Sequence, residues 1–330
     1  MKTVPLGNAP CEVSALCLGT MYFGTTVAEA DAFRLLDAYV EAGGAFLDTA
    51  NKYACWVQGG QGGESESVLG RWMKERRNRA GLFIASKVGL AMPGMTAGLR
   101  AAQIVEACEQ SLRRLGTEVI DLYYAHADDR ETPLEESLAA FDQLQRAGKV
   151  RFLGASNFTA WRLQEARGVS EAHGWPQYVC AQMRHTYLRC DPWVPLAFAA
   201  QRVATPELLD YCRERNVRLL AYSPLLGGAY SRSDRPLEAA YRCAENDARL
   251  ARLGEAARCR GATINQMVLA WLMQGEPAAI PVMAASNLSQ VHENLGALEL
   301  RLESTELARL ALKVSAPPGA QEYTKENTKC

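Results

Sequence analysis

The sequence lacks the cysteine arrangements that bind metal or build a disulfide framework. Its ten cysteines are scattered along 330 residues, with no Cys-x-x-Cys pair and no Cys/His cluster of zinc spacing. Several, such as Cys180, lie within apolar runs, which is typical of buried thiols that stay reduced. We therefore expect no metal site and no disulfide-stabilised secreted domain.

Long apolar runs and a strong charge of one sign are also absent. No window approaches the roughly 18 apolar residues of a membrane span, and residues 1–5 form no apolar signal region. The net charge is −1, from 36 basic and 37 acidic residues, and the basic block at residues 74–79 ends a predicted helix. We expect a soluble, cytoplasmic protein without a membrane or nucleic-acid partner.

The sequence does contain a regular alternation of short apolar runs and amphipathic stretches. The apolar runs are too short for typical helices and have the composition of buried parallel strands. They are residues 15–19, 45–49, 82–87, 119–126, 150–156, 178–182, 218–223 and 278–283. Between them, apolar residues repeat at helical spacing, with a predicted capping box at Thr132 and further helix starts at Thr205 and Thr263.

Eight strand–helix units predict an α/β fold with a parallel sheet inside and helices outside. A closed (β/α)8 TIM barrel and an open doubly wound sheet both have this count. No Gly-x-Gly-x-x-Gly follows the first strand, which disfavours a dinucleotide-binding open sheet. Residues 1–14 are expected to form a short hairpin at the barrel bottom, within a single domain over residues 1–330 that ends in a C-terminal tail.

Polar side chains end six of the predicted strands. In a (β/α)8 barrel the chemistry takes place at the C-terminal ends of the strands, so these side chains are expected to meet around one site. They are Asp48, Lys87, His126, Ser156 with Asn157, Gln182, and Tyr222 with Ser223. Each of these residues, taken alone, could have an ordinary structural role, such as a helix cap, a surface lysine or a core histidine. A series of six polar strand ends is much less expected by chance.

These positions resemble the aldo-keto reductase family. The matching segments are residues 46–50 with Tyr53, 84–87, 120–126, 154–158, 221–225 and 281–294. The likeness extends from about Leu16 to Leu298, with the motifs in the family's order. It implies a barrel that transfers hydride between a nicotinamide cofactor and a small carbonyl compound or alcohol.

The resemblance implies a catalytic tetrad of Asp48, Tyr53, Lys87 and His126. Hydride addition to a carbonyl carbon leaves charge on the oxygen, which must then receive a proton. Tyrosine, with an ordinary pKa of about 10, can carry that proton at neutral pH, and a nearby ammonium group eases its release. Asp48 would keep Lys87 charged, and His126 would orient the carbonyl group. The alternative for Tyr53 is simple core packing.

The resemblance also implies a cofactor site. Ser156, Asn157 and Gln182 would bind the nicotinamide carboxamide, and Tyr222 would stack on the ring unless it is a core tyrosine. The other implied cofactor contacts are Gly19, Thr20, Met21, Asp48, Ser223, Leu225, Ala285, Ser286, Asn287, Gln290, Glu293 and Asn294.

One departure from the family concerns the 2′-phosphate that distinguishes NADP from NAD. Many relatives place an arginine or lysine soon after the eighth strand, since a phosphate attracts such groups. Here the only basic residue between Pro281 and Asn294 is His292, and Ser286 and Asn287 offer hydrogen bonds without charge. The resemblance implies NADPH as the cofactor. The missing basic residue leaves NADH as the alternative.

The substrate site is expected to include Met21, Tyr53, Trp56 and His126. Trp56 lies in a glycine-rich segment, residues 54–63, which predicts a flexible loop beside the site. An aromatic wall with some polar groups fits sugar-like carbonyl compounds, lactols and aromatic aldehydes equally well.

Two other functions fit the same residues. Potassium-channel β subunits resemble this family and bind the cofactor while serving as partner-binding modules, although here the strands are predicted from near residue 4, without a long N-terminal inactivating segment. A NAD-dependent dehydrogenase of sugar lactols or alcohols is favoured by the missing base at the phosphate position. A monomer and a homo-oligomer both fit the sequence.

Overall fold

Eight parallel strands form a closed barrel in the computed structural model, which describes residues 1–311. The hydrogen-bonded order is β10-β3-β4-β5-β6-β7-β8-β9, so the first barrel strand closes onto the last. The strands are β3 (Cys17–Gly19), β4 (Phe46–Asp48), β5 (Phe83–Val88), β6 (Ile120–Ala125), β7 (Val150–Ser156), β8 (Tyr178–Arg184), β9 (Arg218–Tyr222) and β10 (Ala279–Met283). The predicted TIM barrel is confirmed, and the predicted C-terminal tail lies outside the described residues.

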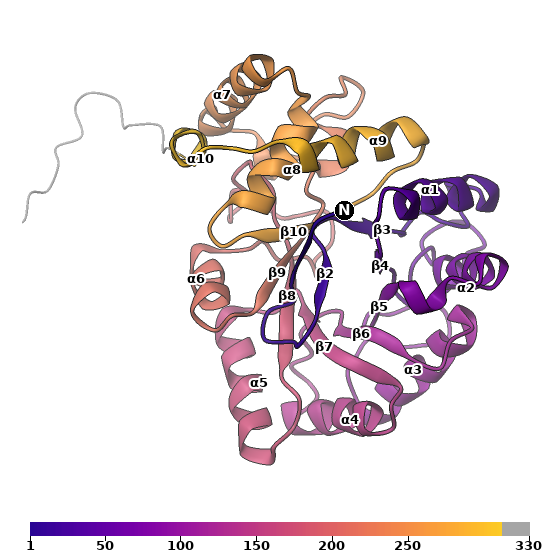
Figure 1. Cartoon of the computed structure of the whole chain (residues 1–330). Helices are drawn as coiled ribbons and strands as arrows, with labels where there is room; N and C mark the ends of the chain where they lie inside the picture. The colour runs from indigo at the N-terminus through magenta and orange to yellow at the C-terminus, as the bar shows by residue number, and fades with distance from the viewer. Residues whose placement is uncertain (312–330) are drawn as a thin grey trace, which may run out of the picture.

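Helices surround the barrel on all sides (Figure 1). They are α1 (Glu29–Glu41), α2 (Glu64–Arg76), α3 (Ala101–Leu115), α4 (Leu134–Arg146), α5 (Ala160–His173), α6 (Pro206–Glu214), α7 (Ala244–Arg260), α8 (Ile264–Gln274), α9 (Leu288–Gly296) and α10 (Ser304–Ala311). In α3 the apolar residues Ile104, Cys108 and Leu112, which repeat at helical spacing, are buried. None of the described helices is long and apolar enough to cross a membrane.

Two of the three predicted helix caps are confirmed. Thr205 accepts a hydrogen bond from the Leu208 amide, and Thr263 forms a capping box at the start of α8. The capping box at Thr132 is wrong. Pro133 takes the N-cap position of α4 with an extended ψ of 139°, and no side chain caps this helix. Thr132 is therefore one residue too early in the chain to bond to the first free amides.

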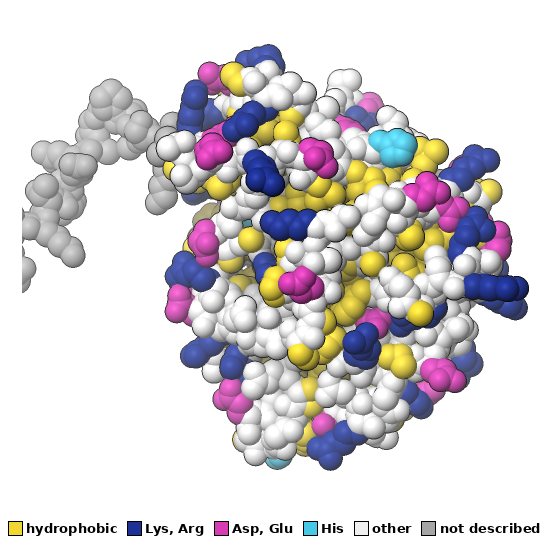
Figure 2. Space-filling model, viewed as in Figure 1, with side chains coloured by type: hydrophobic (Ala, Val, Ile, Leu, Met, Phe, Trp, Pro, Cys, Tyr) yellow, Lys and Arg dark blue, Asp and Glu magenta, His cyan; other side chains and the backbone are white. Residues whose placement is uncertain are grey.

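The N-terminal hairpin closes one end of the barrel, as predicted. Strands β1 (Thr3–Pro5) and β2 (Glu12–Ser14) pair antiparallel, and Leu6 and Val13 pack in one cluster with the side chains inside the barrel. Figure 1 views the barrel from this end, and Figure 2 shows hydrophobic side chains gathered near its middle with charged ones mostly around the rim.

The barrel interior is filled by side chains rather than open. Tyr124 of β6 is fully buried there, against Gly154 of the neighbouring strand β7. A Cβ atom on Gly154 would lie 2.5 Å from the Tyr124 ring, so only glycine leaves room for it. With the interior packed and the hairpin over the bottom, the C-terminal strand ends provide the surface for a site.

Candidate active site

Three predicted tetrad side chains are joined at one point above the barrel core. The Lys87 ammonium group donates to the Asp48 carboxylate, to the Thr49 carbonyl oxygen at 2.7 Å and to the Tyr53 hydroxyl at 2.9 Å. Asp48 and Lys87 are buried and Tyr53 is half-buried, so the three side chains form one chain of contacts that ends at the Tyr53 hydroxyl.

Local structure explains how these residues meet. Asp48 ends β4 opposite Ala85 of β5, and Lys87 lies two residues beyond Ala85, so both side chains point to the same side of the sheet. Tyr53 returns to them through a turn in which its amide donates to the Ala50 carbonyl oxygen.

Burial and charge act in opposite directions on this chain. Burial would lower the pKa of Lys87, but the charges of Asp48 and Tyr53 and their hydrogen bonds leave that pKa raised. Burial raises the pKa of Tyr53 to about 12, and the Lys87 charge offsets part of that increase. At neutral pH, Lys87 is charged and Tyr53 holds its proton, the state required of a proton donor.

His126, the fourth predicted tetrad residue, lies beside Tyr53. It follows β6, where its amide donates to the Val88 carbonyl oxygen, and its ring centroid is 6.0 Å from that of Tyr53. Its Nδ1 atom is buried without a hydrogen-bond partner in the described part of the chain. Burial, and then the charge of Lys87, hold the pKa of His126 well below its ordinary value, so the ring is neutral.

This depressed pKa predicts a loss of stability in acid. The unfolded state binds a proton below the ordinary histidine pKa of about 6.5 and the folded state does not, so stability falls as the pH drops from about 6.5 toward the folded pKa. Between pH 7.5 and 5.5, His126 should account for about 1 kcal/mol of the loss in unfolding free energy. Urea unfolding of wild type and His126→Gln at both pH values measures this.

His185 provides the control for that experiment. Burial lowers the pKa of His185 to about 4, so His126→Gln should keep part of the acid sensitivity, and removing both histidines should weaken it further. Equal losses of stability in wild type and the double variant would show that neither ring stays neutral because of burial.

Three predicted cofactor residues extend the network. Gln182 donates from Nε2 to the second Asp48 carboxylate oxygen at 2.8 Å, across the barrel from β8 to β4. Asn157 donates to the His126 carbonyl oxygen at 3.0 Å and accepts from the Tyr222 hydroxyl at 2.8 Å. The tetrad, Gln182, Asn157 and Tyr222 therefore form one connected site.

A buried hydroxyl cluster beneath the tetrad was not predicted as a unit. The Thr20 and Ser65 hydroxyl groups are 2.8 Å apart, and the Thr49 hydroxyl donates to Ser65 at 2.9 Å. Thr20 also donates to the Asp48 carbonyl oxygen at 3.0 Å. The cluster fixes the backbone that carries Asp48 and the Thr49 carbonyl oxygen, and so holds two acceptors of Lys87. The Thr20 side chain, predicted to contact cofactor, is fully buried in it.

Four further predicted cofactor contacts, Ser286, Asn287, Gln290 and Glu293, form a second group in and just before α9. Asn287 caps this helix by accepting from the Gln290 amide, and the Gln290 side chain accepts from the Ser286 amide and hydroxyl. Glu293 accepts from Asn265 of α8 at 3.2 Å. Asn265 was not among the predicted cofactor residues, because it lies on another helix, 28 residues before Glu293 in the sequence.

Most of the remaining predicted residues occupy the same end of the barrel. Gly19 ends β3, Ser223 follows β9, and Ala285 precedes α9. Met21, Trp56 and Leu225 lie in the segments after β3, β4 and β9, whereas Asn294 is buried near the C-terminal end of α9. No group of three or more His, Cys, Asp or Glu side chains within residues 1–311 is arranged to hold a metal ion.

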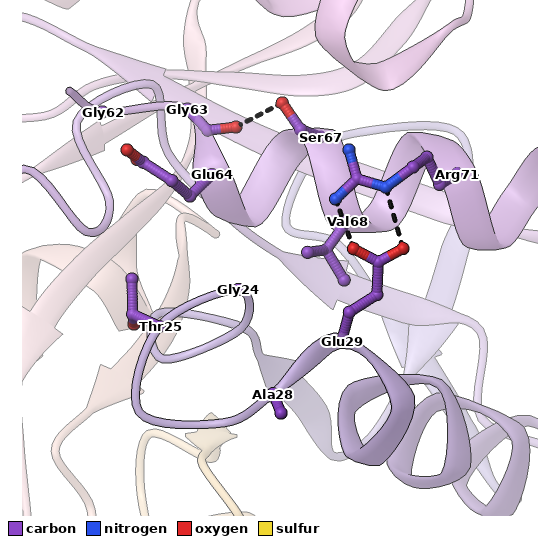
Figure 3. A pocket seen from close by; sticks show the side chains of 10 residues that line it. All are labelled: Gly24, Thr25, Ala28, Glu29, Gly62, Gly63, Glu64, Ser67, Val68 and Arg71. Atoms are coloured by element: carbon purple, nitrogen blue, oxygen red, sulfur yellow. Dashed lines mark hydrogen bonds and ion pairs between the residues drawn. The ribbon is translucent and has the colours of Figure 1, made fainter. Parts of the chain in front are cut away.

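A cavity of about 390 Å³ lies beside this site, between the loops that follow β3 and β4 (Figure 3). Its lining includes the ion pair of Glu29 with Arg71 and the Ser67 hydroxyl, which donates to the Gly63 carbonyl oxygen. No tetrad residue lines it. This cavity therefore borders the end of the glycine-rich segment rather than the reacting groups.

The fold and the Tyr–Lys–Asp–His arrangement define a barrel oxidoreductase, and comparisons with known proteins agree. The profile of the Aldo/keto reductase family matches residues 15–314. The oxidoreductase YrpG of Bacillus subtilis is 30% identical, covering 97% of this chain and 98% of its own. Norsolorinic acid reductase stcV of Emericella nidulans is 30% identical over 91% of this chain and 78% of its own, and protein tas of Escherichia coli is 30% identical over 92% and 94%.

The chain therefore belongs to the aldo/keto reductase family. It is an oxidoreductase enzyme whose family uses a nicotinamide cofactor and acts on small carbonyl compounds.

Proposed function

We propose that Tyr53 is the proton donor in NADPH-dependent reduction of an aldehyde or ketone, and the proton acceptor in the reverse reaction. The observation that supports this is the chain from buried Asp48 through Lys87 to the Tyr53 hydroxyl. A protonated phenol held against an ammonium group can release its proton as negative charge develops on a carbonyl oxygen.

The residues around the tetrad fit the nicotinamide end of the cofactor. A carboxamide both donates and accepts hydrogen bonds. The Ser156 hydroxyl accepts from Asn157 Nδ2 at 3.0 Å, which leaves its own O–H free to donate. Tyr222 is only half-buried, so part of its ring can be covered by a flat group. The cofactor supplies the hydride when bound, and Ser156, Asn157, Gln182 and Tyr222 would hold it.

The other residues orient the substrate and hold the charge in place. His126, neutral because it is buried, lies beside the Tyr53 ring and would hold the carbonyl oxygen toward the Tyr53 hydroxyl. Lys87 keeps a positive charge beside that hydroxyl. Asp48 fixes the position of Lys87 through one carboxylate oxygen, and Gln182 binds the other.

The direct test of this function is NADPH consumption with a panel of aldehydes and ketones. Steady turnover of at least one carbonyl compound, with the matching alcohol as product, is expected. Tight cofactor binding without turnover of any compound would instead favour the cofactor-sensing role of a regulatory subunit.

We also propose that the preference for NADPH over NADH is small, because the start of α9 offers the 2′-phosphate only neutral groups. Asn287→Arg should then raise this preference. A well-aligned guanidinium–phosphate contact is worth about 1.5–3 kcal/mol, or about tenfold or more in the ratio of the two Kd values. The measurement is the Kd of each cofactor by fluorescence titration.

Asn287→Ala is the matched control, because Asn287 caps α9. Loss of the cap costs about 1 kcal/mol of stability in both variants, but only the arginine adds charge. If the Kd ratio changes equally in both variants, the phosphate does not lie near Asn287.

A further inference from the structure

The ammonium group of Lys87 lies over two aromatic rings in addition to its three hydrogen bonds. Its Nζ atom is 4.8 Å from the centroid of the Tyr53 ring and 5.6 Å from the centroid of the Tyr124 ring. Both distances are within the roughly 6 Å at which the electron-rich face of a ring attracts a cation. Tyr53 belongs to the tetrad, whereas Tyr124 belongs to the packed interior of the barrel.

Strand pairing brings the Tyr124 ring beside Lys87. Tyr124 of β6 is the register partner of Lys87 on β5, and on its other side it is the register partner of Gly154 on β7. Side chains in one such row point to the same side of the sheet. A Cβ atom on Gly154 would lie 2.5 Å from the Tyr124 ring, so the missing side chain leaves the space that the ring occupies. Three neighbouring strands therefore fix where the ring lies.

The hydroxyl group of Tyr124 does not explain why a tyrosine stands here. Tyr124 is fully buried, and its hydroxyl lies beside the Cys180 thiol, a weak hydrogen-bonding group, without making a hydrogen bond within residues 1–311. A buried hydroxyl without a partner lowers stability, and branched aliphatic side chains are the usual filling of such barrels. The explanation therefore has to come from the aromatic ring.

The buried charge of Lys87 gains from a ring at this place. Lys87 is the one fully buried lysine within residues 1–311, and loss of water disfavours its charged form. Its three N–H groups already donate to Asp48, to the Thr49 carbonyl oxygen and to the Tyr53 hydroxyl. Further stabilisation has to come from a group that needs no N–H, and the face of an aromatic ring is such a group.

We propose that Tyr124 is a positioning residue whose ring holds the Lys87 ammonium group, in its charged form, at the Tyr53 hydroxyl. Tyr124 is buried inside the barrel and acts only through Lys87. This inference rests on the proposed function, because the charge of Lys87 matters to the reaction only if Tyr53 transfers the proton.

The test withdraws electron density from the ring while keeping its shape. Tyr124→Phe keeps the aromatic face and should keep the wild-type pH profile. Phenylalanines with one, two and three ring fluorine atoms, introduced at position 124 by amber suppression, weaken the attraction, so Lys87 loses its proton at lower pH. The high-pH limb of kcat/KM should then move stepwise to lower pH, by about 0.5–1 pH unit over the series. The other titratable groups near Lys87, which all stay unchanged, are Asp48, Tyr53, His126 and Cys17.

The same series at position 123 is the matched control. Tyr123 precedes Tyr124, is also fully buried, and its hydroxyl also lacks a partner among the described residues. Its ring lies edge to face with Phe141, and within residues 1–311 the rings under Lys87 are those of Tyr53 and Tyr124. Fluorination at position 123 should leave the pH limb in place. A limb that moves equally at both positions, or at neither, overturns the proposal, and so does a Tyr124→Phe enzyme that has already lost the wild-type limb.

Urea unfolding separates failure of this inference from failure of the proposed function, because it needs no substrate. The series at position 124 is measured with Lys87 present and in Asp48→Asn/Lys87→Met, which lacks the buried charge. Fluorine changes the size and hydrophobicity of the ring equally in both backgrounds, so the unfolding midpoint should fall along the series only relative to the uncharged background. Equal trends in both backgrounds overturn the role of Tyr124.

The two readouts together assign each outcome. The expected coupling in stability, found in an enzyme that reduces no carbonyl compound, refutes the proposed function and leaves the contact between ring and ammonium group in place. Coupling in stability without a shift of the pH limb in an active enzyme assigns the ring to the fold alone, which overturns the inference.

Discussion

Tyr53→Phe is expected to lower kcat/KM for a good carbonyl substrate by about 10²- to 10⁴-fold, the usual contribution of a positioned proton donor. The substitution removes only the hydroxyl that Lys87 contacts at 2.9 Å. Lys87 keeps its bonds to Asp48 and to the Thr49 carbonyl oxygen, so the buried charge stays paired and the barrel should stay folded.

The loss should appear in kcat rather than in the Kd of the cofactor. Steady-state kinetics, with fluorescence titration of NADPH, separates the two quantities. Tyr123→Phe is the matched control, because the Tyr123 hydroxyl is buried without a partner among the described residues and lies outside the site. A Tyr53→Phe enzyme that kept most of the wild-type kcat/KM would show that another group delivers the proton.

The barrel and the tetrad could be predicted because both depend on short-range patterns. Buried parallel strands appear as apolar runs, and Asp48, Lys87 and His126 each lie at the end of one of these runs. The side-chain alternation within β5 then puts Lys87 on the same side as Asp48. The contact between them needs only the pairing of two neighbouring strands.

Features that depend on distant segments could not be predicted in this way. Ser65 is the second residue of α2, and its bonds to Thr20 and Thr49 form only when α2 lies against the segments that follow β3 and β4. The Gln182–Asp48 hydrogen bond across the barrel likewise depends on the closed order of all eight strands. The wrong cap at Thr132 has a local cause, since Pro133 takes the cap position itself.

Lys87→Met should have the second large effect, this time on stability as well as on activity. The substitution leaves the Asp48 carboxylate buried, with Gln182 as its remaining side-chain partner and no positive charge beside it. Removing one member of a buried ion pair typically costs about 3–5 kcal/mol. Urea unfolding should show this loss, and carbonyl reduction should fall at least as far as in Tyr53→Phe.

The double variant Asp48→Asn/Lys87→Met separates the two effects. Neutral side chains of similar size remove the uncompensated charge, and replacing both members of a buried pair is often neutral for stability. The side-chain carbonyl oxygen of the introduced asparagine can still accept from Gln182, so most of the lost unfolding free energy should return. Activity should not return, because no ammonium group lies beside the Tyr53 hydroxyl. If the double variant recovered turnover together with stability, the ion pair would serve only to hold the fold, and the role of Lys87 in proton transfer would be wrong.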